Sequence, residues 1–151
     1  MRTVAEKMGL RDGMRAYLAR ADETVLEAMK LPRLELSPEL VGCFDYLHVF
    51  VTTQDALENA FATMRPHLAK RGSLWVSWLK GTPKGSDLNL QSVIRIGYDY
   101  GLVESKTLAV DALWSAMKFT HPIPGKNYQN SFGSLKDPCA LPWQSSCRNG
   151  G

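Results

Sequence analysis

Two long runs of hydrophobic side chains stand out near the middle of the chain. Residues 44–51 (FDYLHVFV) and residues 73–79 (SLWVSWL) are rich in aromatic and β-branched side chains. Runs of this kind are typical of strands that other elements cover on both faces, as in a parallel sheet. Four further segments have a weaker strand pattern, namely residues 14–21, 33–37, 103–110 and 113–121.

Short helical signals lie between these strands. Residues 3–9 predict a helical turn that ends at Gly9. Asp22 is placed to cap a helix over residues 23–30, because an aspartate side chain accepts from the free N–H groups of the first turn. Another helix is predicted over residues 88–100, with one apolar face made of Leu90, Val93, Ile94 and Gly97.

The longest helical pattern follows the run at 44–51 and is predicted to end at Gly72. Lys70 and Arg71 would occupy its last turn, where cations suit the helix dipole. Pro66 interrupts the pattern and predicts a kink or a break. The apolar stripe has helical spacing and consists of Leu57, Ala60, Phe61, Met64 and Leu68.

The order of these elements predicts an α/β fold. Strands alternate with helices over most of the chain, which indicates a mostly parallel sheet. The last two strands are joined by Asp111 and Ala112 alone, so they must pair as an antiparallel hairpin. After residue 121 four of the eight prolines and four of the twelve glycines follow without periodicity. We therefore expect one domain over residues 1–121 and an irregular tail over residues 122–151.

Composition and charge exclude several classes of protein. The chain has 151 residues, 44% of them hydrophobic and 22% charged, an ordinary balance for one soluble globular domain. A net charge of +3 without a basic stripe gives no footprint for nucleic acid. No apolar run approaches 18 residues and the first ten residues do not resemble a signal peptide, so we expect a cytoplasmic protein without a membrane span.

The three cysteines are also interpreted as those of a cytoplasmic protein. Cys43 adjoins an apolar run and is interpreted as a small buried residue. Cys139 and Cys147 are close enough in sequence for a disulfide, although free thiols are expected in a reducing cytosol.

Residues 44–121 resemble the C-terminal half of the class I methyltransferase fold. FDYLHVFV is similar to a strand often written F-D-x-I, and MRPHLAKRGSLWVSW (residues 64–78) is similar to the L-x-P-G-G-x-L-x-I passage that follows it. A longer resemblance, over residues 5–120, is to a family of small bacterial proteins of unknown function. It is carried by LRDGMRAYL, FDYLHVFVT, GSLWVSWLK, SDLNLQSVIRIGYDYGLVESK and AVDALWSAMKF. It implies a reduced Rossmann-like, methyltransferase-like fold and no settled activity.

The resemblance raises S-adenosylmethionine as a cofactor, yet the expected cofactor motif is missing. Methyltransferases of this fold hold the cofactor at a glycine-rich turn after the first strand. Here residues 19–23 (ARADE) contain no glycine. Glu35, a candidate for binding ribose hydroxyls, lies inside its strand, and the chain is too short for the usual third strand and helix. These absences favour a protein that is not an active methyltransferase and lean against an enzyme.

The loop over residues 80–87 (KGTPKGSD) is the first candidate site, for a phosphate or carboxylate. It lies between the end of a predicted strand and the start of a helix, where anions bind to free N–H groups. Lys80 and Lys84 would add charge, and Ser86 could donate a hydrogen bond. In the favoured alternative the loop is solvated, and Ser86 or Asp87 caps the helix.

The second candidate site lies where the first and third strands would end side by side. Arg20, Asp22, Thr52 and Thr53 are expected to meet there and could line a crevice for a small molecule. The favoured alternative is two helix caps and a surface arginine.

Aromatic and histidine side chains give weaker signals. Trp114 and Ser115 open the last strand, where a planar ligand could stack, although core packing is the favoured interpretation. His48 lies inside the most apolar strand and is interpreted as a hydrogen-bonded core histidine. No spacing of ligands predicts a metal site.

Three functions remain open at this point. The favoured one is a methyltransferase-like domain without methyltransferase activity that binds a small anionic ligand or a protein partner. The second is an S-adenosylmethionine-dependent methyltransferase with an atypical cofactor site. The third is an assembly protein that forms a homo-oligomer through its C-terminal tail.

Overall fold

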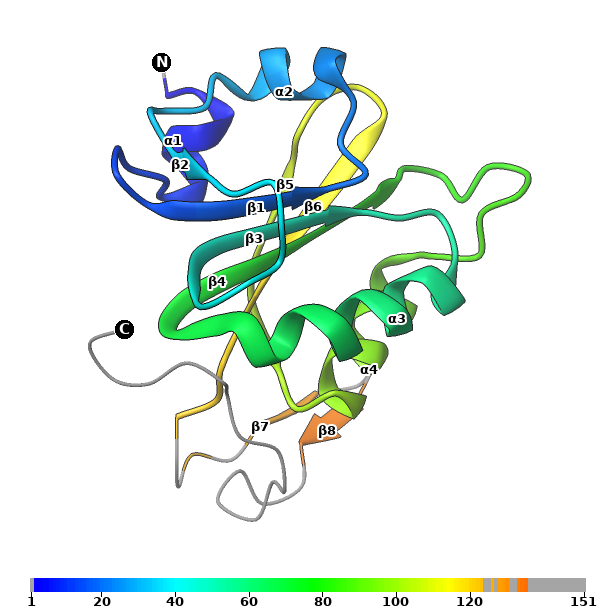
Figure 1. Cartoon of the computed structure of the whole chain (residues 1–151). Helices are drawn as coiled ribbons and strands as arrows, with labels where there is room; N and C mark the ends of the chain where they lie inside the picture. The colour runs from blue at the N-terminus through cyan, green and yellow to red at the C-terminus, as the bar shows by residue number, and fades with distance from the viewer. Residues whose placement is uncertain (1, 124–125, 127, 131–132, 136–151) are drawn as a thin grey trace.

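Six strands form one sheet in the computed structural model, which describes residues 2–123, 126, 128–130 and 133–135 (Figure 1). The strand order is β2-β1-β3-β4-β6-β5. The first four strands in this order run parallel, and β6 is antiparallel to β4 and to β5. The strands are β1 (Arg15–Ala19), β2 (Glu35–Leu36), β3 (Phe44–Phe50), β4 (Leu68–Leu79), β5 (Val103–Ala109) and β6 (Trp114–Thr120). The predicted mostly parallel sheet with a C-terminal antiparallel hairpin is confirmed.

Helices cover both faces of this sheet (Figure 1). One face carries α1 (Val4–Met8) and α2 (Glu23–Met29), and the other carries α3 (Gln54–Met64) and α4 (Leu90–Asp99). Side chains from β3 enter both layers, because successive residues of a strand point to opposite faces. Leu47 and Val49 pack with α3 and α4, whereas Tyr46 and Phe50 pack with α1 and α2. The two hydrophobic cores therefore share the central strands.

The predicted end of the long helix is wrong. The helix α3 ends at Met64, and Pro66 lies in a short 3-10 turn, η1 (Arg65–His67), before β4 begins at Leu68. Proline cannot donate in the helical ladder, so the chain leaves the helix there. The residues at 68–72 are strand instead, and Gly72 approaches β3 so closely that a Cβ would lie 2.8 Å from the Phe44 carbonyl oxygen.

Three smaller differences concern single residues. Leu90 was placed on the apolar face of α4 but is 42% exposed, because the buried face starts at Ser92. The strand β2 has two residues where five were predicted. Cys43 is half-buried and disulfide-bonded rather than a buried thiol, and Cys139 and Cys147 lie outside the described residues.

Part of the expected tail is described as well. Two short strands, β7 (Tyr128–Asn130) and β8 (Gly133–Leu135), form an antiparallel pair, and β8 lies beside α4 (Figure 1). The division into a domain over residues 1–121 and a tail over residues 122–151 stays a prediction. So does assembly through that tail, because most of its residues lie outside the described part of the chain.

A buried polar network lies between the sheet and the layer of α1 and α2. The His48 ring is fully buried, with Nδ1 2.5 Å from the Tyr46 hydroxyl and Nε2 2.6 Å from Ser77 Oγ. Phe50 stacks on the imidazole, with 4.4 Å between the ring centroids. Burial lowers the pKa of His48 to about 3 and raises the pKa of Tyr46, so both groups are neutral at pH 7. The prediction of a hydrogen-bonded core histidine is confirmed.

Gly97 is expected to be essential for the packing of α4 on the sheet. A Cβ at this position would overlap the ring of the buried Phe119 on β6. Gly97→Ala should lower the free energy of unfolding by about 1–3 kcal/mol, although alanine favours a helix by about 1 kcal/mol. Gln91→Ala, on the exposed side of the same helix, is the matched control and should change it by less than about 0.5 kcal/mol. Equal urea midpoints for the two variants would contradict this packing.

His48 is expected to make stability depend on pH. Its pKa is about 3 in the folded chain and about 6.5 in the unfolded chain, so between these values the unfolded state binds the proton more readily. The free energy of unfolding should therefore fall as pH drops below about 6.5, by up to about 1.4 kcal/mol per pH unit from this group. Urea denaturation at pH 7, 6 and 5 measures the slope. His48→Gln should reduce it; the same slope in this variant as in the unchanged chain would show that His48 does not titrate in this way.

Candidate functional site

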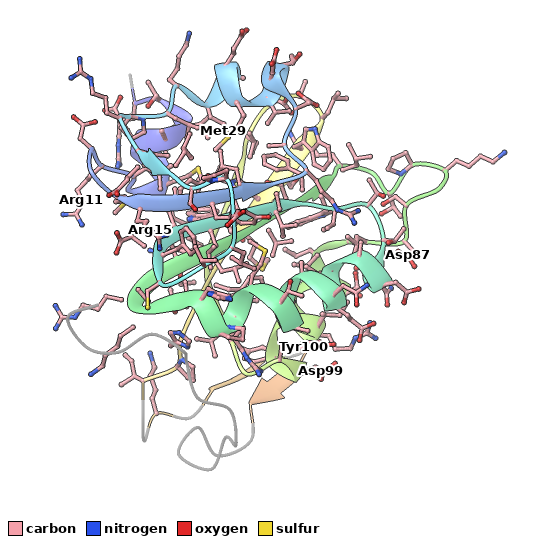
Figure 2. The ribbon with its side chains drawn as sticks, viewed as in Figure 1. Arg11, Arg15, Met29, Asp87, Asp99 and Tyr100 are labelled. Atoms are coloured by element: carbon pink, nitrogen blue, oxygen red, sulfur yellow. The ribbon has the colours of Figure 1, made fainter. Side chains whose placement is uncertain are left out.

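The carboxyl ends of the parallel strands form the candidate site. The segments that leave β1, β3 and β4 there contain most of the residues predicted to bind a ligand. Trp114, at the start of β6, lies at the same edge because it pairs with Leu79 at the end of β4. Asp87 lies at this edge of the sheet, and Arg11 lies at the opposite edge (Figure 2). Ligands of open α/β sheets bind outside the carboxyl ends of the strands.

The turn after β1 has an unusual backbone. Arg20 is exposed and has a φ of 63°, in the left-handed region that favours glycine. Asp22 follows in extended conformation and caps α2, with its Oδ1 accepting from the Val25 N–H at 2.9 Å. The turn therefore has a left-handed residue, as a glycine-containing turn would, although it contains no glycine.

The turn after β3 is held by two hydrogen-bonded residues. Thr53 caps α3, since its Oγ1 accepts from the Ala56 N–H at 3.2 Å. Asp87 Oδ1 accepts from the Gln54 N–H at 2.7 Å, and the Asp87 N–H donates to the carbonyl of the exposed Thr52. The loop before α4 is thereby tied to the first turn of α3, and a carboxylate of the chain itself already occupies that turn.

The expectation that Ser86 or Asp87 caps α4 is wrong. Asn89 is the cap, with its Oδ1 accepting from the Ser92 N–H at 2.9 Å. Asp87 precedes the cap residue Asn89 by two positions, and the buried Leu88 lies between them. Ser86 Oγ is buried and has no hydrogen-bond partner among the described residues.

The two lysines of the loop after β4 differ in their surroundings. Lys80 Nζ donates to the Asp111 carbonyl at 2.6 Å, and the Lys80 N–H donates to the Leu113 carbonyl at 2.9 Å. Lys84 is exposed. Lys80 therefore fastens the loop to the turn between β5 and β6, an arrangement that reduces its availability for an anion.

The tryptophans mainly pack in the interior. Trp114 is half-buried, and its ring meets Phe50 edge to face with 5.2 Å between the centroids. Ser115 beside it is half-buried and pairs with Trp78 across the ladder. Trp75 and Trp78 enter opposite cores, as their spacing along a strand predicts. Of the tryptophans in the described part of the chain, Trp114 is the one that is half-buried, and it lies at this edge of the sheet.

A small cavity lies beside Arg20, between the end of β1 and α3. Its volume is about 170 Å³, and its lining includes Tyr17, Ala19, Val49, Ala56 and Asn59. Arg20 is the one residue of this lining that was predicted from the sequence to bind a ligand. Tyr17 and Ala19 are two residues apart in β1, so the sequence predicts that they share one face of the sheet. It does not predict that α3 leaves part of this face uncovered.

Glu39 is an acidic residue that the sequence reasoning did not consider. It lies in the segment after β2, where its N–H donates to Ser37 Oγ at 3.3 Å and its side chain is exposed. An acidic residue beyond the second strand suits the hydroxyl groups of a ribose. Glu35, which the sequence analysis considered for this role, is exposed within β2.

The described part of the chain has neither a metal-ion cluster nor a membrane-spanning helix. No group of three or more His, Cys, Asp and Glu side chains is placed to hold a metal ion there. The helices found in those residues are all too short or too polar to cross a membrane.

Comparison with known proteins shows the fold. No protein-family model and no curated protein matches the sequence of this chain. Solved structures do match its backbone. Magnesium protoporphyrin IX methyltransferase from Synechocystis PCC 6803, solved with bound SAH, has a TM-score of 0.52 at 10% identity, over 78% of this chain and 78% of that chain.

Two further structures agree. A TehB-like SAM-dependent methyltransferase from Corynebacterium glutamicum has a TM-score of 0.50 at 10% identity, over 78% of this chain and 85% of that one. A methyltransferase from Pyrococcus furiosus has a TM-score of 0.50 at 14% identity, over 78% and 79%. The resemblance to a family of unknown function stays a prediction.

The expectation that leaned against an enzyme is contradicted by these matches, because the similar structures are named as methyltransferases. It relied on the missing glycines, on the position of Glu35 inside its strand and on the short chain. For the first of these, Arg20 has the left-handed backbone after β1 without a glycine. At these identities the comparison shows the fold alone. The chain has the Rossmann-like α/β fold found in S-adenosylmethionine-dependent methyltransferases.

Proposed function

We propose that this chain is an S-adenosylmethionine-dependent methyltransferase with an atypical cofactor site at the carboxyl end of β1. The observation that carries the proposal is the left-handed backbone of Arg20, at φ 63°, directly after β1. This conformation keeps a tight turn where the fold family brings the cofactor close to the backbone. The likeness to methyltransferase structures supports the same assignment.

The residues present fit the cofactor in part. The cavity beside Arg20, about 170 Å³, is smaller than the roughly 300–1,000 Å³ of common ligand pockets. A nucleoside-sized molecule would therefore fill it with one portion and lie over the exposed turn of Arg20 and Asp22 with the rest. The carboxylate of Glu39 would accept hydrogen bonds from ribose hydroxyls.

Each of these residues has a separate task in the proposal. The backbone of Arg20 sets the path of the turn, and Tyr17 and Ala19 line the cavity next to it. Asp87 holds the loop after β4 against α3, which keeps the edge of the site in place. When bound, the cofactor supplies an electrophilic methyl group for an acceptor.

Filling the cavity is expected to block the cofactor. Ala56→Leu adds three carbons to the cavity wall on α3, whereas Ala62→Leu adds them to an exposed position of the same helix. In a thermal-shift measurement, SAH at 100 times its dissociation constant should stabilise the unchanged chain by about 2.7 kcal/mol, a shift of several degrees. We expect Ala62→Leu to keep this shift and Ala56→Leu to lose most of it. Absence of a shift with both SAH and S-adenosylmethionine in the unchanged chain would contradict the proposal.

Arg20 is expected to act through its backbone. Arg20→Gly relieves the left-handed strain and should raise the free energy of unfolding by up to about 1 kcal/mol, with SAH binding retained. Arg20→Val should lower stability, since a β-branched side chain suits this conformation worst. Calorimetric titration of both variants with SAH measures the outcome. Loss of binding in Arg20→Gly would show that the guanidinium, not the turn, holds the cofactor.

A further inference from the structure

A larger cavity lies at the other edge of the sheet, away from the proposed cofactor site. Its volume is about 500 Å³, within the common range for small-molecule pockets. It is formed where the loop from α1 to β1 meets the beginnings of β1 and β3, the first part of β4 and the last part of β6. Arg11, in that loop, lies at the opposite end of the sheet from Asp87 (Figure 2).

The rim of this cavity is fixed by hydrogen bonds. Gly13 has a φ of 86°, and its N–H donates to the Arg33 carbonyl at 2.9 Å. The Arg33 N–H donates back to Asp12 Oδ1 at 2.8 Å. The loop is therefore fastened to the segment before β2, and the cavity exists before any ligand arrives, which lowers the cost of binding.

Three cations from three separate elements line the cavity. They are Arg11 from the loop, Arg71 from β4 and Lys118 from β6. Among the described residues none of these three side chains makes a hydrogen bond or an ion pair. Lys106, the partner of Lys118 in the ladder, differs, because its ammonium donates to the Lys7 carbonyl at the end of α1.

The two carboxylates of the cavity are already partly satisfied. Asp45 Oδ2 accepts from the Arg15 N–H at 3.0 Å, and Asp12 Oδ1 accepts from the Arg33 N–H. Both hold backbone in place at the rim. The lining therefore has three cations and two carboxylates, a net charge of +1, and the cations are the charged groups that lack a hydrogen-bond partner among the described residues.

The remaining lining adds an apolar floor. Met8 is buried, Met14 is half-buried, and the lining also includes the hydroxyl residue Ser73. A carbon skeleton can rest on the methionines, whose flexible side chains adapt to irregular shapes. Guanidinium groups bind carboxylate and phosphate oxygens in pairs of hydrogen bonds.

We propose that this cavity is a second binding site, for a small organic anion that carries two or more carboxylate or phosphate groups. Arg11 and Arg71 bind the anionic groups, Lys118 neutralises the remaining charge, and the methionines contact the carbon skeleton. The site is separate from the proposed cofactor site and does not depend on that assignment.

Calorimetric titration of the full chain tests the proposal with two probes, citrate for carboxylates and pyrophosphate for phosphates. Binding of either probe is expected, and the tighter one identifies the anionic group. Arg71→Gln and Lys118→Gln should each weaken binding about tenfold, the effect of losing one charge-assisted hydrogen bond. Lys70→Gln is the matched control, because Lys70 is the exposed neighbour of Arg71 and does not line the cavity. It should change the affinity less than twofold.

Two results would overturn the proposal. One is the absence of binding of both probes to the unchanged chain. The other is an equal loss in Lys70→Gln and Arg71→Gln, which would show a response to net charge alone. Urea midpoints establish that each variant is folded. Ala56→Leu should bind the anion normally, so failure of the cofactor proposal and failure of this one are distinguishable.

Discussion

Burial of β3 and β4 on both faces is the constraint on which the rest of the structure depends. Hydrophobic side chains of these two strands must enter both layers, so helices are needed above and below the sheet. Parallel pairing of β1, β3 and β4 then sends the connecting segments to two opposite edges. Each edge gathers residues that are far apart in the sequence, and each has its own cavity.

The two edges differ in how polar groups are satisfied. At the carboxyl ends of the strands, Asp22, Thr53 and Asp87 are engaged with the first turns of α2 and α3. A ligand at this edge would therefore mainly contact the backbone of the turn at Arg20 and the apolar side chains of the small cavity. At the amino ends, backbone N–H groups satisfy Asp12 and Asp45, while cations without partners among the described residues line the cavity. The first arrangement suits a small neutral portion of a ligand, and the second suits an anion.

The buried polar network between these edges is uncharged at pH 7. His48 is held neutral between Tyr46 and Ser77, and its hydrogen bonds join β3 to β4 beneath α1 and α2. A satisfied buried network of this kind favours one packing of the sheet over others. The close contact of Gly97 with Phe119 has a similar effect on the other face, where it fixes the distance of α4 from β6.

The sequence by itself determined the buried central strands, the caps of α2 and α3 and the terminal hairpin. These features depend on a few neighbouring residues only, so the order of residues is enough to predict them. They are the hydrophobic runs, the caps Asp22 and Thr53, and the two-residue connection that begins at Asp111. Only the tertiary structure decided that residues 68–72 are strand. It also decided that Asp87 accepts a hydrogen bond from the first turn of α3, although α4 is the helix that follows it in the sequence. It alone brought Arg11, Arg71 and Lys118 to one cavity, because strand register sets which distant side chains meet, and register is fixed by packing of the whole sheet.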